Sequence, residues 1–403
     1  MGAASSDTSD TVHTRPTLRE IAELFLKLGT VAFGGPAAHI AMMEDEVVRR
    51  RQWLTREEFL DYLGATNLIP GPNSTELAIH IGHAQGGWPG LLVAGICFIL
   101  PAALFVGCIA WAYVRFGTLP AIHGVLYGVK PVVIVVILQA LWRLGRSAVN
   151  NVRLALVGVA ALLCVLVGVN ELLILAGAGL ATVIWTRLSQ GQRGAHRIAP
   201  LVAAIGPHSP HVTSETASAL TTLGSGAAVS AGLWPLFGVF VKAGAVLFGS
   251  GYVLLAFLRA DLVQRYGWLT EQQLLDAVAI GQITPGPVFT TATFIGYLLG
   301  RGPGALVATC GIFLPAFFFV AISGPLLPRL RRSVTARAVL DGVNVASLAL
   351  LVAVLWELGH TAFVDPLTII LGLASALAVL RFGVQPALIT VGGALVGLIA
   401  YLR

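Results

Sequence analysis

The residues best suited to bind a ligand follow two copies of the tripeptide Pro-Gly-Pro, at positions 70–72 and 285–287. The two prolines remove backbone donors, so a helix that reaches either tripeptide must end there. The next helix begins with unpaired N–H groups and a partial positive charge, which together favour a small oxyanion. The residues that we expect to contact such an anion are Gly71, Asn73, Ser74, Thr75, Gly286, Thr290 and Thr291.

The tripeptides also have a purely structural interpretation. The prolines would kink packed helices, and the hydroxyls after them would donate to carbonyls of the preceding turn. We favour the anion site because the motif and its polar followers occur twice.

Lysine usage points to the same kind of ligand. The chain has 22 arginines but only three lysines, Lys27, Lys130 and Lys242, and all three lie inside apolar runs. A charge near the centre of a bilayer costs at least about 2.5 kcal/mol, so such residues either reach back to the interface or have a function. Lys27 and Lys242 lie near the start of a run, where both explanations hold. Lys130 lies deeper, directly before Pro131, and is the stronger candidate to offset the charge of an anion.

Three ionisable residues follow the first tripeptide at helical spacing. Glu76, His80 and His83 are four and three positions apart and therefore share one helical face. A glutamate beside histidines inside a membrane suits a proton relay. Alternatively, the histidines reach the membrane interface and Glu76 stabilises the positive end of its helix. Asp341 is the second candidate for a group that couples anion and proton movement.

These residues lie in a duplicated sequence. Residues 27–72 align without a gap with residues 242–287, 215 positions later, and 16 of the 46 aligned positions are identical. The alignment then continues at an offset of 214, which pairs Lys130 with Asn344 and adds Asn344 to the expected site. Gly34, Gly35 and Gly249 are also assigned to the expected site, because they would let the first span of each half break or pack closely. Plain helix packing explains these glycines about equally well.

The composition indicates that membrane helices carry these residues. The 403-residue chain is 56% hydrophobic and only 11% charged, whereas a soluble domain has about 25% charged residues. Apolar runs predict about ten spans. The runs begin near Ile21, Gly90, Ile122, Leu154, Leu172, Phe237, Gly304, Ala336, Leu367 and Ala387.

Each tripeptide is preceded by a helix that begins at a threonine. Thr55 and Thr270 are followed at the third position by Glu58 and Gln273, the pattern of a capping box. A second short helix follows each tripeptide, and neither short helix alone spans a bilayer. Each pair is expected to form a broken or re-entrant element, which is tolerated at membrane depth where it lines a cavity or is buried in protein.

Loop charges indicate that the halves are inverted. One connection carries Arg143 and Arg146, whereas its counterpart carries Glu357 and Asp365. Under the positive-inside rule, equivalent loops then face opposite sides, which requires an odd number of spans per half. We predict an all-α, polytopic membrane protein of two inverted-topology repeats. Its segments are a polar tail at 1–17, the first repeat at 18–188, a polar linker at 189–235 and the second repeat at 236–403.

Several classes of protein are disfavoured. Cys97, Cys108, Cys164 and Cys310 occur singly within apolar segments, so we expect no metal site. There is no P-loop and no cluster of nucleophile, base and orienting group, so neither ATP-driven transport nor an enzyme is expected, and no cofactor is predicted. The loop arginines set orientation and do not indicate a nucleic-acid partner.

The sequences Phe33-Gly34-Gly35-Pro36, Trp53-Leu54-Thr55 and Pro70-Gly71-Pro72, with their second-half copies, resemble the chromate ion transporter family in its long-chain, two-domain form. The resemblance covers nearly the whole chain outside the N-terminus and linker. It implies an inner-membrane (plasma-membrane) protein that exports chromate with the membrane's electrochemical gradient and confers chromate resistance, with sulfate as a competitor. The second half departs from the pattern, because it reads Phe248-Gly249-Ser250-Gly251.

The sequence therefore predicts a secondary transporter in the lipid bilayer that holds a tetrahedral oxyanion between its two broken elements. A sulfate or other oxyanion importer and a passive anion channel are the alternatives. The assembly state is left open, with a homodimer among the options.

Overall fold

The computed structural model describes residues 16–32, 35–117, 120–191, 232–247 and 253–402, and these described residues form helices and loops without a strand. The helices of the first half are α1 (Leu18–Val31), α2 (Gly35–Glu44), the π-helical turn η1 (Asp45–Arg50), α3 (Arg56–Thr66), α4 (Asn73–Phe116), α5 (Pro120–Ala148), α6 (Val152–Leu166) and α7 (Glu171–Gly191). Those of the second half are α8 (Leu233–Val246), α9 (Leu254–Leu258), the π-helical turn η3 (Arg259–Arg265), α10 (Glu271–Ile283), the short 3-10 helix η4 (Val288–Thr290), α11 (Thr291–Arg332), α12 (Val334–Ala362), α13 (Pro366–Phe382) and α14 (Pro386–Leu402).

Five of the described helices are long and apolar enough to cross a membrane: α4, α5, α7, α11 and α12. The helices α6, α8, α13 and α14 are apolar but shorter. Large apolar side chains remain exposed along many of these helices, for example Leu104, Leu166 and Leu306 at 60–70%. Such surfaces suit lipid rather than water. The chain is therefore a multi-pass membrane protein.

Each Pro-Gly-Pro separates two helices that fold back on each other. Helix α3 ends at Thr66, four residues before the first tripeptide, and α4 begins directly after it. The Tyr62 and His80 rings stack at 5.7 Å, and the Gln85 side chain donates to the Trp53 carbonyl at 2.9 Å. Residues that approach the tripeptide thus lie beside residues that leave it, so α3 and the start of α4 are antiparallel. We call this unit the first hairpin. The second hairpin is formed by α10 and the start of α11.

Local sequence explains where the hairpins begin and turn. The predicted capping boxes are confirmed: the Thr55 hydroxyl accepts from the Glu58 N–H at 3.2 Å, and that of Thr270 accepts from the Gln273 N–H at 3.1 Å. Gly71 and Gly286 have φ of 141° and 87°, a region that favours glycine. Helix α4 turns again at Gly87, so a short arm before this glycine is followed by a long arm that reaches Phe116.

The two tripeptides join the halves to each other. The N–H of Gly71 donates to the carbonyl of Leu247 at 2.7 Å, and the N–H of Gly286 donates to that of Ala32 at 3.0 Å. Ala32 and Leu247 are equivalent in the repeat and end α1 and α8. The tip of each hairpin therefore contacts the end of the first helix of the other half.

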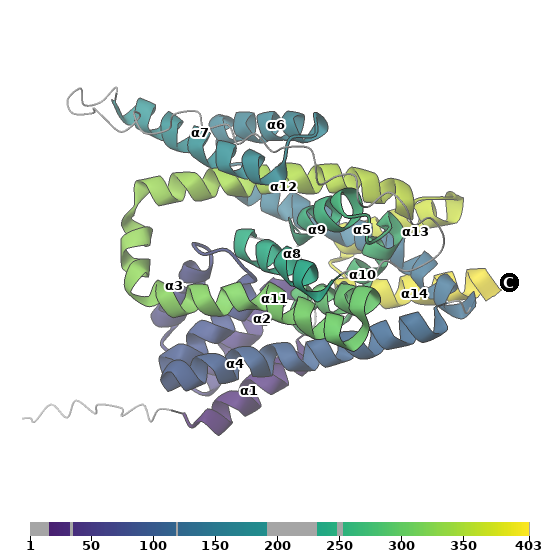
Figure 1. Ribbon diagram of the computed structural model, residues 1–403, viewed down its shortest axis with the longest axis horizontal. Coiled ribbons are helices and arrows are strands. Elements are labelled where there is room, and N and C mark those ends of the chain that lie inside the picture. Colours follow the sequence, from purple (N-terminus) through teal and green to yellow (C-terminus); the bar gives the residue numbers. More distant parts are fainter. Residues whose placement is uncertain (1–15, 33–34, 118–119, 192–231, 248–252, 403) are drawn as a thin grey trace, which may run out of the picture.

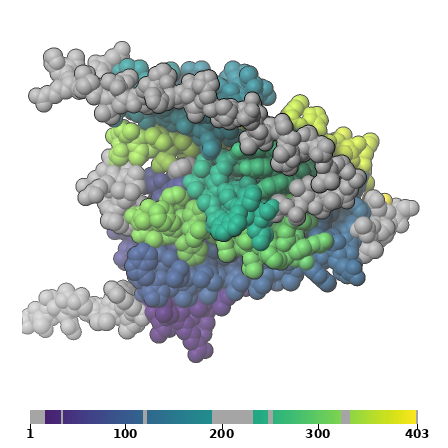
Figure 2. Space-filling view, viewed as in Figure 1, coloured from purple at the N-terminus to yellow at the C-terminus, as the bar shows by residue number. Residues whose placement is uncertain are grey.

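The last two helices of each half also pack against the other half. In Figure 1, α6 and α7 lie along α12, and α13 and α14 lie near α5, in agreement with their contacts. Gly393 and Gly397 of α14 approach the backbone of Gly128 in α5, while the Thr182 hydroxyl of α7 donates to the Ala338 carbonyl of α12 at 2.6 Å. Figure 2 shows the consequence on one face, where second-half elements lie between α4 and α6–α7 of the first half. The two halves share one core.

Candidate functional site

A polar pocket of about 260 Å³ lies at the tip of the first hairpin. Both halves contribute to it: α3, α4 and α5 from the first half, and α12 with the residue before α9 from the second. Among the described residues, those lining it are Asn67, Asn73, Leu144, Ser147, Ala148, Asn150, Val253, Asp341, Asn344, Ser347 and Leu348. Six of these eleven side chains carry an amide or a hydroxyl, and none is a lysine or arginine. We call this cavity the polar pocket.

The break in the first hairpin explains why polar groups gather here. Asn67 ends α3 and Asn73 begins α4, and their side chains are joined by a hydrogen bond of 2.8 Å from Asn73 Nδ2 to Asn67 Oδ1. Pro72 cannot cap α4 with a side chain, so the first turn of α4 has no side-chain cap, unlike α3 and α10. The pocket therefore lies beside a helix N-terminus whose N–H groups favour an anion.

Several buried polar atoms around this tip have no hydrogen-bond partner in the part of the chain that the structure describes. They are Asn73 Oδ1, the Thr75 hydroxyl and the Ser347 hydroxyl, and the last two residues are 0% and 2% exposed. Buried polar groups are nearly always hydrogen-bonded, so these atoms require water or a ligand. Asn73 and Ser347 line the polar pocket from opposite halves of the chain.

The tip of the second hairpin is different. The Thr290 hydroxyl donates to the Pro287 carbonyl and the Thr291 hydroxyl to the Val288 carbonyl, both at 2.8 Å. The structural interpretation of the motif thus describes these two threonines, whose hydroxyl protons are already used. The two halves do not offer equal sites.

Lys27 and Lys242 form equivalent ion pairs. Lys27 Nζ lies 2.6 Å from Glu46 Oε1, and Lys242 Nζ lies 2.7 Å from Asp261 Oδ2. Glu46 and Asp261 are aligned in the repeat. The hydrogen bond from Lys27 holds the pKa of the Glu46 carboxyl below its ordinary value. In both halves the first helix is therefore tied to the π-helical turn.

Lys130 is the buried lysine, and its partner is on the other half. Its ammonium lies 2.9 Å from Asp276 Oδ1, and the Tyr113 hydroxyl donates to Asp276 Oδ2 at 2.9 Å. Lys130 is 7% exposed and Asp276 is 3% exposed. The sequence offered one signal for Asp276, its identity with Asp61 in the repeat, and none for Tyr113.

The expected coupling residues lie around the short arm of α4. Glu76 is fully buried, and neither of its carboxyl oxygens has a hydrogen-bond partner within the described residues. A Cβ on Gly71 would collide with Glu76 Oε1, so the carboxyl group lies against the first tripeptide. His80 stacks on Tyr62, and His83 contacts the Trp88 ring edge-on at 5.7 Å. Asp341 is exposed and lines the polar pocket.

One buried histidine was not predicted. His39 is 1% exposed, and its ring nitrogens lie 3.3 Å from the Ser74 hydroxyl and 3.1 Å from the Ala32 carbonyl. That carbonyl also accepts from Gly286, so His39 links the beginning of α4 to the contact between the halves. Gly35 has φ of 77° and open space around its α-carbon. Gly34 and Gly249 lie outside the described residues.

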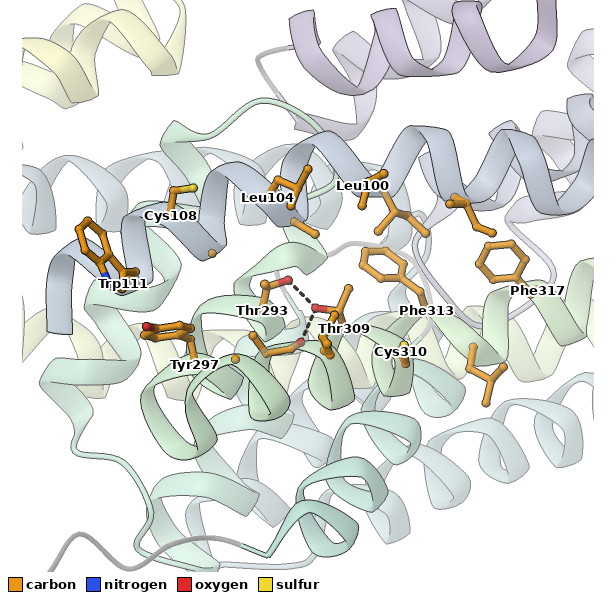
Figure 3. Close-up of a pocket in the computed structure, with 18 of the residues that line it drawn as sticks. Leu100, Leu104, Cys108, Trp111, Thr293, Tyr297, Thr309, Cys310, Phe313 and Phe317 are labelled. Carbon is orange, nitrogen blue, oxygen red and sulfur yellow. Dashed lines mark hydrogen bonds between the residues drawn. The ribbon is translucent and has the colours of Figure 1, made fainter. Parts of the chain in front are cut away.

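An apolar groove, larger than the polar pocket, is a poor site for an anion. It lies between the long arms of α4 and α11, has a volume of about 770 Å³ and is lined mainly by apolar side chains such as Leu104 and Phe313 (Figure 3). Two of the hydroxyls that line it, those of Thr293 and Thr309, already bond to each other at 2.7 Å, which leaves that of Tyr297 among the described lining residues. A desolvated dianion would find no charge and few free donors there.

A profile of the chromate transporter family matches residues 19–183 and 234–398, once in each half. The chain belongs to the chromate transporter family. It is 35% identical to the chromate transport protein of Cupriavidus metallidurans, over 97% of this chain and 95% of that protein. Identity is 31% to the probable chromate transport protein of Synechococcus elongatus, over 94% of both chains. It is 30% to the chromate transport protein of Pseudomonas aeruginosa, over 89% of this chain and 85% of that one. No solved structure matches this member of the family.

Proposed function

We propose that this protein exports chromate across the plasma membrane and that chromate binds in the polar pocket. The observation that carries the proposal is the meeting of Asn73, at an uncapped helix N-terminus, with Asn344 and Ser347 of the other half in one cavity. Chromate is a tetrahedral anion with four acceptor oxygens, which amide, hydroxyl and backbone N–H donors can satisfy. Membership of the family supports the substrate.

The hydrogen-bond donors of the polar pocket are uncharged, and the charged side chain among its described lining residues is the carboxylate of Asp341. Uncharged donors aligned with a helix dipole bind an anion more weakly than a lysine or arginine would, so this pocket can release its ligand. Arginines lie instead near the ends of α5 and α12 that meet at the pocket. Arg143 and Arg146 flank the pocket residues of α5, and Arg337 lies one turn before Asp341, all exposed. Their field would draw an anion toward the mouth.

The proposed membrane arrangement is two inverted repeats with about ten spans and two re-entrant hairpins. The pocket supports it, because the C-terminal end of α5 meets the N-terminal part of α12 although these helices are equivalent in the repeat. Alternate opening on the two sides would then move the anion as in secondary transporters. The export direction and the use of the electrochemical gradient are part of the proposal.

The test is chromate uptake into inverted membrane vesicles, with and without a pH gradient and with excess sulfate. The proposal requires saturable uptake that depends on the gradient and is inhibited by sulfate, which has the same tetrahedral shape. Uptake confined to right-side-out vesicles would instead indicate an importer. Uptake that rises linearly with chromate and ignores the gradient would indicate a channel.

A further inference from the structure

We propose that the Lys130, Asp276 and Tyr113 cluster is the closed counterpart of the polar pocket, a second half-site that opens to the other side of the membrane when its ion pair separates. The inference rests on the proposed function, because it assigns the second half-site of the same transporter. Asp276 and Tyr113 are positioning residues in this account, and Lys130 is the group that receives the anion.

The repeat places the two sites at equivalent positions. Asn344, which lines the polar pocket from α12, corresponds to Lys130 on α5. Just as Asn344 shares its cavity with residues of the first hairpin, Lys130 contacts Asp276 on α10, in the second hairpin. Helices α5 and α12 therefore each place one polar side chain against the hairpin of the other half.

The polar pocket and the equivalent region around Lys130 differ in whether they contain a cavity. Leu144 and Ala148 of α5 line the polar pocket and are partly exposed. Their equivalents on α12, Leu358 and Ala362, are 0% and 2% exposed. One polar donor of the pocket is also lost, since Ser347 corresponds to Val133, which is fully buried. One half-site is thus a cavity, and the other is packed.

The cluster keeps Lys130 away from an anion. The ammonium lies 2.9 Å from Asp276, whose second oxygen accepts from Tyr113, so the carboxylate is held on two sides. Within the described residues, Tyr113 on α4 and Lys130 on α5 are the titratable groups that contact Asp276. The nearest other charged residue on its helix is Glu271, which pairs with Arg259. A buried ion pair whose partner is removed leaves an uncompensated charge, so separation of this pair favours entry of a new anion beside Lys130.

The asymmetry follows from residue types. The carboxylate is present in both hairpins, as Asp61 and Asp276, but Asp61 is exposed, and the α12 residue equivalent to Lys130 is the neutral Asn344. Only the second-hairpin site combines the carboxylate with a lysine and a tyrosine. The polar pocket, with its neutral donors, is therefore open. The half-site at Lys130 is closed by the ion pair between Lys130 and Asp276.

The test measures access to an introduced thiol, without chromate, in a background that lacks the four native cysteines. Ala148→Cys and Ala362→Cys form a matched pair, because the two alanines are equivalent in the repeat. A membrane-impermeant thiol reagent is applied to intact cells and to inverted vesicles. We expect label at position 148 from one side and little label at position 362 from either side.

Asp276→Asn should raise labelling at position 362 by about tenfold, from the side opposite to that which labels position 148. The matched control, Asp61→Asn, changes the equivalent exposed carboxylate and should leave position 362 protected. The paired exchange Lys130→Asp with Asp276→Lys keeps an ion pair and should also keep position 362 protected, which separates opening from unfolding.

No increase at position 362 in a folded Asp276→Asn protein, or an increase from the same side as position 148, would overturn the proposal. Since the labelling needs no chromate, it can fail or succeed independently of the vesicle uptake assay.

Discussion

At the scale of single residues, the buried hydroxyl of Ser347 provides a test of the polar pocket. Ser347 and Ser323 are both 2% exposed. The Ser323 hydroxyl donates to the Val320 carbonyl at 2.9 Å, whereas the Ser347 hydroxyl has no partner among the described residues. We expect Ser347→Ala to raise the half-saturation constant for chromate about fivefold, the loss of one hydrogen bond of about 1 kcal/mol. Ser323→Ala should leave it unchanged in the same vesicle assay. Equal constants for both variants would remove Ser347 from the site.

Glu76 allows a prediction about coupling. Its carboxyl group is buried against the first tripeptide without a hydrogen-bond partner among the described residues, and His80 follows it on the same face of α4. A relay predicts that Glu76→Gln and His80→Ala flatten the pH dependence of chromate flux, expressed as the ratio to wild type at each pH. Glu23→Gln, an exposed change on α1, is the control. If the ratio is constant across pH in both variants, Glu76 is a helix-stabilising charge and Asp341 becomes the coupling candidate.

Residue chemistry was only partly predictable from the sequence. The burial of Lys130 followed from its depth in an apolar run. Its partner Asp276 did not, because the pair joins residues that are far apart in the chain and belong to different halves. The hydrogen bonds from the Thr290 and Thr291 hydroxyls to nearby carbonyls could not be predicted either. In sequence, a threonine that bonds to a preceding carbonyl cannot be told from one that faces a ligand.

At the scale of elements, the two tripeptide glycines should respond differently to substitution. A Cβ at Gly71 would meet the movable end of Glu76, whereas a Cβ at Gly286 would lie 2.6 Å from the Ala102 Cβ and 2.9 Å from the Gly29 carbonyl oxygen. Both positions have φ that disfavours alanine. Gly71→Ala should mainly weaken chromate affinity, and Gly286→Ala should mainly lower the melting temperature.

Gly107→Ala serves as the control for both, because it lies in helix α4 with open space around it. Thermal unfolding of the purified variants and the vesicle assay separate the two effects. Normal affinity in Gly71→Ala would argue that the first tripeptide only shapes the hairpin.

Helix boundaries were the part of the fold that sequence predicted best. The capping boxes at Thr55 and Thr270 and the helix ends beside each tripeptide depend on neighbouring residues, whose chemistry is local. The turn at Gly87 and the exchange of α6–α7 and α13–α14 between halves depend on packing across the molecule, which no local pattern specifies.

At the scale of the whole molecule, the inverted arrangement makes a prediction about sides. The helix ends that carry Arg146 and Arg331 are not equivalent in the repeat, yet the positive-inside rule places both on the cytoplasmic side. Single thiols introduced by Ser147→Cys and Ser333→Cys should therefore resist an impermeant reagent in intact cells and react in inverted vesicles. Strong labelling of either one in intact cells contradicts the inversion.

Equilibrium binding of radiolabelled chromate to the purified protein tests most directly whether the polar pocket holds chromate. We expect saturable binding to the wild type that excess sulfate displaces. In the double variant Asn73→Ala with Asn344→Ala, affinity should fall at least about tenfold, because donors from both halves are lost. Ser323→Ala should bind as the wild type does. Wild-type affinity in a folded double variant would contradict the placement of the chromate site in the polar pocket.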